Sequence, residues 1–318
     1  MKSVFDSQRR KTLQALAGGA ALAGSWPLQT NAQEKSALLT RVIPRTGQKI
    51  AVVGLGTQFV LDVGDDLDKR KVRVAMIRTL LDSGGSVIDT APSYGPAETQ
   101  LGSMLEEMKA RDRVFLSTKY RVPGRDGAIA ETKESLRKLR TQKLEVLLRH
   151  NIGFVPKVDA DTHLAVAREL KAQGMCRYIG VTHSQDQPKA NERLIEILRT
   201  EKIDFIQVNY SMAERSVEER LLAAAAETGT AVMCNLPYAR GALFRAVQGK
   251  TVPEWAKEFD APTWGQFFLK YLIAHPSVNV VIPGTDRVEH MQDNIDAGRT
   301  RLPNAAQRKR MVEFIGAV

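Results

Sequence analysis

The stretch Ser86-Val87-Ile88-Asp89-Thr90 is a short run of β-forming residues, and a longer amphipathic segment follows it at 97–110. The same succession of strand and helix repeats eight times from about residue 50 onward. Such alternation is typical of parallel strands joined by crossover helices. The predicted strands lie at 50–54, 86–90, 114–119, 144–150, 177–182, 205–209, 231–235 and 278–282, and the predicted helices at 69–83, 97–110, 127–140, 161–174, 187–200, 216–228, 263–275 and 287–297.

Eight such units match the length of a closed barrel, which is typically about 250 residues. An open doubly wound sheet would carry a Gly-x-Gly-x-x-Gly turn, but the nearest candidate, Gly54-Leu55-Gly56-Thr57-Gln58-Phe59, lacks the third glycine. We therefore predict a single α/β domain, a (β/α)8 TIM barrel, over residues 43–318. The stretch 236–261 has little helical pattern and is predicted to be a functional loop at the barrel mouth.

The N-terminus predicts an export signal. Arg9-Arg10 precedes a mildly apolar run at 15–24, and small residues suited to cleavage stand at 30–32. The paired arginines resemble a twin-arginine (Tat) signal, so we expect a cleaved signal peptide at 1–32, a linker at 33–42 and a periplasmic mature protein. An amphipathic surface helix is the alternative. The run is too short to span a membrane, so membrane contact is expected only through the export machinery.

The composition argues against several classes of partner. The net charge is +10, but the basic residues are scattered among 36 carboxylates without a basic run, so we expect no nucleic-acid partner. Cys176 and Cys234 lack metal-ligand spacing and are predicted to be buried thiols, although a disulfide between them stays open for an exported protein. A metal-dependent hydrolase would need several ligands at strand ends, and only His150 of five histidines falls clearly at one. Nothing in the sequence indicates the oligomeric state.

Four ionisable residues fall at or just after predicted strand ends, where barrel active sites are built. Asp89 ends the second strand and Tyr94 follows it, Lys119 ends the third strand, and His150 ends the fourth. A lysine buried at the end of an apolar strand needs a carboxylate partner. The set suits proton donation to a carbonyl that receives a hydride: Lys119 would lower the pKa of Tyr94, Asp89 would hold Lys119 charged, and His150 would either orient the carbonyl oxygen or share the proton.

Eight motifs stand in a fixed order along the chain: Ile43-Pro44-Arg45-Thr46-Gly47, Val53-Gly54-Leu55-Gly56-Thr57, Ile88-Asp89-Thr90-Ala91-Pro92-Ser93-Tyr94-Gly95, Ser117-Thr118-Lys119, Ile179-Gly180-Val181-Thr182, Gln207-Val208-Asn209-Tyr210, Ala239-Arg240-Gly241 and Ile282-Pro283-Gly284. In these motifs the chain resembles the aldo-keto reductase family, from about residue 43 to 297. The resemblance implies that Tyr94 is the acid-base residue, with Asp89, Lys119 and His150 as its partners, and that NADPH is the hydride donor, bound extended across the barrel mouth.

The resemblance also implies a cofactor pocket. His183 stands where many members have asparagine, and Asn235 where many have a tyrosine that stacks on the nicotinamide, so Tyr238 is expected to supply an aromatic face. Arg287 is expected to bind the 2′-phosphate, so we favour NADPH over NADH although Asp286 suits that phosphate poorly. The full set of expected cofactor-binding residues is Gly56, Thr57, Asp89, Thr182, His183, Gln207, Asn235, Tyr238, Arg240, Gly284, Thr285, Arg287, Asp293 and Asn294.

The resulting functional hypothesis is an NADPH-dependent reductase of a small aldehyde, ketone or sugar carbonyl, acting reversibly on the alcohol. The alternative is an NADP-binding regulatory or accessory subunit with weak reductase activity. Substrate specificity is expected to lie in loops near 59–68, 122–127, 152–158 and 236–261. Trp255, Tyr120 and Tyr238 are predicted to form apolar walls of the pocket.

Overall fold

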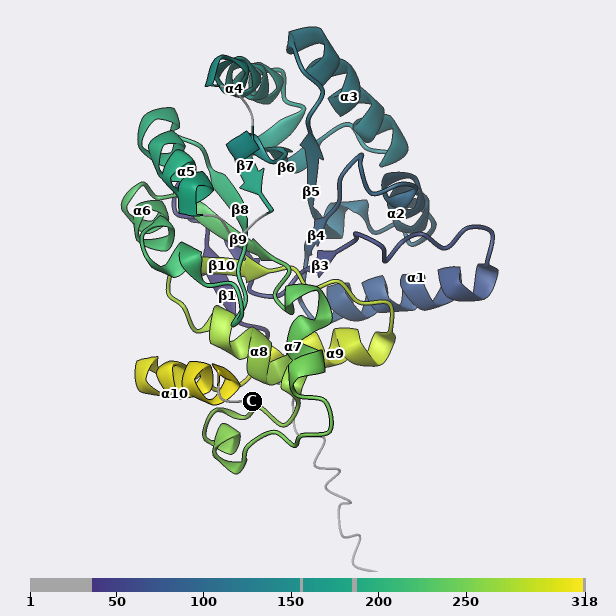
Figure 1. Ribbon diagram of the computed structural model, residues 1–318. Helices are drawn as coiled ribbons and strands as arrows, with labels where there is room; N and C mark the ends of the chain where they lie inside the picture. Colours follow the sequence, from purple (N-terminus) through teal and green to yellow (C-terminus); the bar gives the residue numbers. More distant parts are fainter. Residues whose placement is uncertain (1–35, 155–156, 185–187, 317–318) are drawn as a thin grey trace, which may run out of the picture. The chain divides into compact units, whose positions relative to one another are not determined.

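The computed structural model describes residues 36–154, 157–184 and 188–316, with the side chains of 154, 157–160 and 188 also excluded. Within these residues the chain forms an eight-stranded parallel sheet and a separate two-stranded sheet (Figure 1). The predicted signal peptide at 1–32 lies outside the described residues. No helix in the described part of the chain combines the length and the apolar character needed to cross a membrane.

The strands and helices alternate as the sequence predicts. The strands are β1 Thr40–Val42, β2 Lys49–Ala51, β3 Leu55–Gly56, β4 Val87–Asp89, β5 Phe115–Tyr120, β6 Leu144–Arg149, β7 Cys176–His183, β8 Phe205–Asn209, β9 Ala231–Asn235 and β10 Val278–Val281. The α-helices are α1 Leu67–Asp82, α2 Ala97–Glu107, α3 Arg125–Lys138, α4 Lys157–Ala172, α5 Pro188–Glu201, α6 Leu221–Glu227, α7 Ala242–Ala246, α8 Trp264–Ile273, α9 Val288–Ala297 and α10 Ala305–Gly316. Short 3-10 helices lie at Arg111–Arg113, Ile152–Phe154, Ser216–Glu218, Ala239–Gly241 and Glu254–Phe259.

The large sheet closes on itself as a barrel. Its strands pair in sequence order from β3 to β10. The last strand then meets the first segment, because Val53 forms a parallel bridge with Val281 and the Gly54 N–H donates to the Val281 carbonyl at 2.9 Å. The predicted (β/α)8 TIM barrel fold is confirmed.

The first predicted strand, at 50–54, is divided between two sheets. Its beginning belongs to β2, which pairs antiparallel with β1, and the barrel strand β3 starts only at Leu55. The predicted linker at 33–42 therefore contains a strand, β1. Ile43 and Ile50 at this hairpin are buried in the cluster of side chains that fills the barrel, beside Val87, Phe115 and other inward-facing residues. Burial of these two apolar side chains at the end of the barrel, away from water, stabilises the hairpin.

The segment 236–261 is more ordered than predicted. It contains α7 and the two 3-10 helices at Ala239–Gly241 and Glu254–Phe259. A further helix that the sequence pattern did not predict, α10, follows the barrel.

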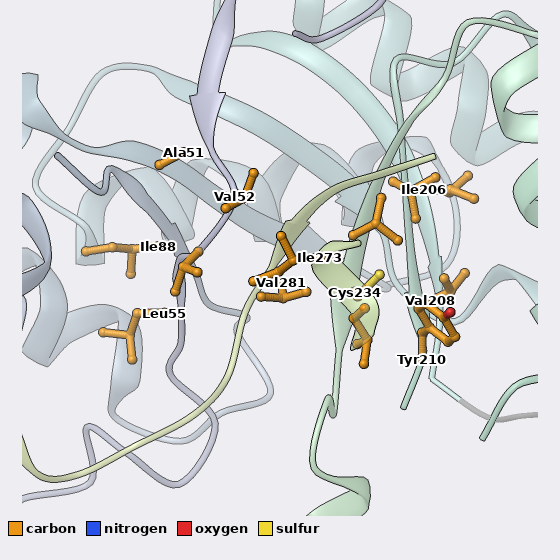
Figure 2. Close-up of a cluster of buried hydrophobic side chains, with 14 of the residues drawn as sticks. Ala51, Val52, Leu55, Ile88, Ile206, Val208, Tyr210, Cys234, Ile273 and Val281 are labelled. Carbon is orange, nitrogen blue, oxygen red and sulfur yellow. The ribbon is translucent and has the colours of Figure 1, made fainter. Parts of the chain in front are cut away.

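A second apolar layer lies between the strands and the surrounding helices. Figure 2 shows part of it, with Val208, Cys234 and Val281 from three neighbouring strands and Ile273 from α8. Both cysteines are free and buried, as the prediction of buried thiols states. Burial raises the pKa of the Cys176 thiol to about 12, so this residue is an unreactive part of the core.

Candidate active site

A buried ion pair stands at the carboxyl ends of β4 and β5. Lys119 Nζ lies 2.6 Å from Asp89 Oδ2 and donates also to the Thr90 carbonyl at 2.8 Å. Both residues are nearly inaccessible, at 2% exposure for Asp89 and 1% for Lys119. Burial alone would lower the pKa of Lys119, but the charge of Asp89, together with Tyr94, raises it above its usual value. Lys119 is therefore a cation at neutral pH, as the sequence predicts.

Ser117 completes the coordination of the carboxylate. Its side chain points the same way as Lys119, two residues further along β5, and its hydroxyl donates to Asp89 Oδ1 at 2.8 Å. Each carboxylate oxygen thus accepts a bond from a different residue of one strand. The sequence reasoning missed Ser117, although its i, i+2 spacing from Lys119 was the available signal.

Tyr94 lies in the turn between β4 and α2, where its N–H donates to the Ala91 carbonyl. Lys119 Nζ is 4.9 Å from the centre of its ring. Burial raises the pKa of Tyr94 above its usual value, an effect that the sequence did not predict, while the charge of Lys119 lowers it by a smaller amount, in the direction predicted. The phenol is therefore protonated at neutral pH, beside a cation that stabilises its anion.

His150 directly follows β6 and faces Tyr94. The two ring centres are 6.4 Å apart at an interplanar angle of 86°. Burial, with the neighbouring cations Lys119 and Arg121, lowers the pKa of His150 to about 3. The imidazole is thus neutral at physiological pH and serves as a hydrogen-bonding group. The structure brings all four predicted ionisable residues together.

Two adjoining cavities open over this group. The first has a volume of about 380 Å³ and is lined by Gly56, Thr57, Gln58, Phe59, Asp89, Tyr94, Leu236, Pro237, Tyr238, Arg240, Gly241, Ile282 and Gly284. The second, of about 630 Å³, is lined by Tyr238, Phe244, Thr263, Trp264, Gly265, Gly284, Thr285, His290, Asp293 and Asn294. Tyr238 and Gly284 line both, so the two cavities adjoin; together they are called the cleft, which extends from Tyr94 to α9.

The predicted cofactor-binding residues fall into two groups. Nine of them line the cleft: Gly56, Thr57, Asp89, Tyr238, Arg240, Gly284, Thr285, Asp293 and Asn294. The other five are not among the cleft-lining residues in the described part of the chain: Thr182, His183, Gln207, Asn235 and Arg287.

Three of these five are engaged elsewhere or exposed. Thr182 Oγ1 accepts from the Asn151 N–H at 2.9 Å, and Gln207 Nε2 lies 3.0 Å from Met233 Sδ inside the barrel. Arg287 is exposed at the start of α9. Their sequence positions are near the barrel mouth, but strand position alone does not determine which side chain meets the cleft.

Local contacts shape the second cavity. Thr263 begins α8 by accepting from the Gln266 N–H, and its hydroxyl donates to Asp293 at 2.9 Å, which ties α8 to α9. Across the cleft, the Tyr238 hydroxyl donates to Asn294 Oδ1, and its ring centre lies 4.8 Å from that of Phe244. Tyr238 is therefore an aromatic wall, as predicted.

The other two predicted wall residues lie elsewhere. Trp255 packs against Phe259 and Phe267, and Tyr120 is fully buried with its hydroxyl donating to the His163 carbonyl. Of the predicted specificity loops, those at 59–68 and 236–261 contribute residues to the cleft. Phe59 and Phe244 line the cavities from within these two predicted loops. Residues 155–156 of the predicted loop at 152–158 lie outside the described residues. Trp264, the first residue of α8, also lines the second cavity and was not predicted, because the helical pattern alone does not show which of its side chains meets the cleft.

The residues present fit a large polar ligand. Three buried polar atoms at predicted cofactor positions have no hydrogen-bond partner among the described residues: Thr57 Oγ1, Asn235 Oδ1 and Asn294 Nδ2. Buried polar atoms are normally paired, so a ligand that supplies both donors and acceptors along this side of the barrel suits them. In the described residues no group of three or more His, Cys, Asp or Glu side chains is arranged to hold a metal ion.

Comparison with known proteins agrees with this site. The family model described as "Aldo/keto reductase family" matches residues 52–313. The chain is 29% identical over 262 residues to methylglyoxal reductase YeaE of Escherichia coli, covering 80% of this chain and 88% of that protein. It is also 29% identical over 230 residues to aldo-keto reductase YhdN of Bacillus subtilis, covering 69% of this chain and 66% of that protein.

The fold also resembles that of a solved aldo-keto reductase from Klebsiella pneumoniae in complex with NADPH. The TM-score is 0.70 at 26% sequence identity, and the match covers 88% of this chain and 95% of that one. Since the family model spans most of the barrel, the chain belongs to the aldo/keto reductase family.

Proposed function

We propose that this chain reduces the carbonyl group of a small aldehyde, ketone or sugar to an alcohol, with NADPH as the cofactor and Tyr94 as the proton donor. The observation that carries the proposal is the arrangement of Asp89, Lys119 and Tyr94 at the floor of a cleft. Asp89 and Tyr94 both line the first cavity, so a carbonyl bound there meets the phenol directly.

The proton donor is set up by its neighbours. Burial keeps the Tyr94 phenol protonated, so it can donate its proton to the carbonyl oxygen. Lys119, held by Asp89 and the Thr90 carbonyl, has one N–H bond left and stabilises the phenolate that remains. Neutral His150, whose ring lies against that of Tyr94, would orient the carbonyl oxygen by a hydrogen bond.

NADPH, when bound, supplies the hydride to the carbonyl carbon. The proton and the hydride together convert the carbonyl to an alcohol, and Tyr94 regains its proton from solvent. Thr57, Tyr238, Thr285 and Asn294 would hold the cofactor along the cleft, and Arg287, exposed at the start of α9, would bind its 2′-phosphate. The carboxylate of Asp286, next to Arg287, would repel that phosphate. The preference for NADPH over NADH is therefore tested by measuring kcat/KM with each cofactor.

The experiment that tests the activity follows the loss of NADPH absorbance with a panel of small aldehydes, ketones and sugars. Methylglyoxal belongs in the panel because the relative YeaE is named for its reduction. We expect turnover with at least one carbonyl and none in its absence. Binding of NADPH without turnover of any carbonyl would instead favour a regulatory or accessory subunit.

We also propose that the protein is exported through the twin-arginine route, with residues 1–32 as a cleaved signal peptide and a mature barrel domain. The support is Arg9-Arg10 ahead of the apolar run at 15–24. That route carries folded proteins, which suits an enzyme that takes up its nucleotide before export. Replacing both arginines by lysine should leave the full-length chain in the cytoplasm, and a periplasmic location of that variant would refute the proposal.

A further inference from the structure

Arg73 is a buried arginine of α1 that joins two loops far apart in sequence. Its Nε donates to the Val60 carbonyl at 2.7 Å, and its Nη1 donates to the Asp286 carbonyl. Arg73 is 8% exposed, so these bonds satisfy a charged group that would be costly to bury without partners. The sequence pattern did not single it out.

The first of these loops forms the mouth of the first cavity. The Val60 N–H donates to the Thr57 carbonyl, which closes a turn over residues 57–60. This turn carries Phe59, whose side chain is 88% exposed at the cavity mouth and whose backbone adopts a φ of 61°. A positive φ is unfavourable for a bulky residue, so the turn depends on its anchors.

The second loop forms the wall shared by both cavities and leads into α9. It contains Gly284 and Thr285, which line the second cavity. The two loops touch through their backbones: the Gly56 N–H donates to the Pro283 carbonyl at 3.2 Å, and a Cβ added to Gly284 would lie 3.4 Å from the Gly56 carbonyl oxygen.

The backbone bonds of Arg73 matter more than its ion pair. The carboxylate of Asp286 is 3.6 Å from Arg73 Nη2, and its side chain is 61% exposed. An ion pair with so exposed a partner contributes little. The two carbonyls, by contrast, fix the guanidinium in one geometry, because its N–H groups point in set directions.

We propose that Arg73 is a positioning residue that couples the nucleotide part of the cleft to the carbonyl part. A nucleotide that orders the loop at 283–287 also orders the turn at 57–60, because both loops are bound to one rigid side chain of α1. The proposal rests on the proposed function, since it takes the two adjoining cavities together to bind NADP(H) and the carbonyl substrate. Arg73 is not among the described residues that line either cavity, so it would act through the two loops.

The test compares Arg73→Met with Arg70→Met. Arg70 lies on the same helix and binds Gln100, Ser103 and Glu107 instead of either loop. Calorimetric titration gives the Kd for NADP⁺, and hydrogen exchange measures amide protection at 57–63 and 283–288 with and without NADP⁺. We expect NADP⁺ to protect both segments in the wild type and in Arg70→Met.

In Arg73→Met we expect NADP⁺ to protect only 283–288, with binding weaker on the order of tenfold. The KM for the carbonyl should rise while kcat per folded molecule at saturation stays unchanged, which a merely destabilising substitution would not produce. Should Arg73→Met fail to fold, Arg73→Lys serves the same test, because an ammonium group cannot reproduce the fork of the guanidinium.

The outcomes separate the two proposals. A wild type that binds NADP⁺ and protects both segments, together with an Arg73 variant that does the same with equal Kd, overturns the coupling role and leaves the proposed function intact. A wild type that binds no NADP⁺ overturns the proposed function itself.

Discussion

The hydroxyl of Ser117 donates to Asp89 Oδ1 at 2.8 Å, while the other oxygen of that carboxylate accepts from Lys119. One strand therefore holds the carboxylate from both sides, at a residue that is only 2% exposed. The consequence is a carboxylate whose orientation is fixed before any ligand binds.

Removing that hydroxyl should loosen the ion pair without abolishing it. We expect Ser117→Ala to lose about 1–3 kcal/mol of unfolding free energy and to lower kcat about tenfold. Chemical denaturation and steady-state kinetics measure the two effects. Ser135→Ala removes another buried hydroxyl, on α3, and should leave kcat unchanged; an equal loss of kcat in both variants would show that Ser117 acts only through stability.

Lys119 should be essential to the reaction and to the charge balance of the site. We expect Lys119→Met to lower kcat by roughly 10²- to 10⁴-fold, because neither Asp89 nor the Tyr94 phenolate then has its cation. Lys270→Met is the matched control, since Lys270 is also fully buried but binds Thr300 and the Arg301 carbonyl instead. If the Lys270 variant lost as much kcat per folded molecule, the assigned role of Lys119 would be wrong.

His150 should make the fold sensitive to acid. Its pKa is about 3 in the folded protein and about 6.5 in an unfolded chain. The unfolded state therefore binds a proton more readily than the folded state. The part of the unfolding free energy that depends on a neutral His150 is fully present above about pH 6.5 and is lost as the pH falls from there towards 3.

When the pH falls from about 7 to about 5, the unfolding free energy of His150→Gln should therefore decrease less than that of the wild type. Denaturant titrations at both pH values measure the difference. His290→Gln, at an exposed histidine of α9, provides the comparison. Parallel pH dependences for His150→Gln and the wild type would contradict the low pKa.

Phe59 should affect the substrate more than the fold. Because its side chain is 88% exposed and its φ is positive, Phe59→Gly relieves strain and should keep or raise the unfolding free energy by up to about 1 kcal/mol. We expect the KM for an apolar carbonyl to rise, because the mouth of the cavity loses its aromatic side chain. An unchanged KM for every carbonyl turned over would show that Phe59 does not contact substrate.

The strands in the middle of the barrel could be predicted closely from the sequence. The bounds of β8 and β9 agree with the prediction because these are uninterrupted buried runs between turn residues. The first strand could not be predicted in this way. The apolar run at 50–54 belongs partly to the hairpin and partly to the edge of the barrel, and no residue in it signals where the hairpin strand ends. Helix α10 was missed because only Met311 of it is fully buried, so its apolar pattern is weak.

The site was predictable where function coincides with the end of a strand. Asp89, Lys119 and His150 could be placed because parallel strands bring their carboxyl ends to one rim. The cleft walls could not, since they depend on loop conformations such as the positive φ of Leu236 and Arg240. Arg73 was also beyond prediction, because it binds backbone carbonyls, which every residue possesses.

The most direct measurement of the proposed chemistry is turnover by Tyr94→Phe. This variant removes only the hydroxyl and keeps the ring between Lys119 and His150. We expect NADPH oxidation with the best carbonyl of the panel to fall at least about 10²-fold, while the Kd for NADP⁺ stays within about twofold of the wild type because no new charge is left near the nucleotide. Equal turnover by the wild type and Tyr94→Phe would contradict the role of Tyr94 as proton donor.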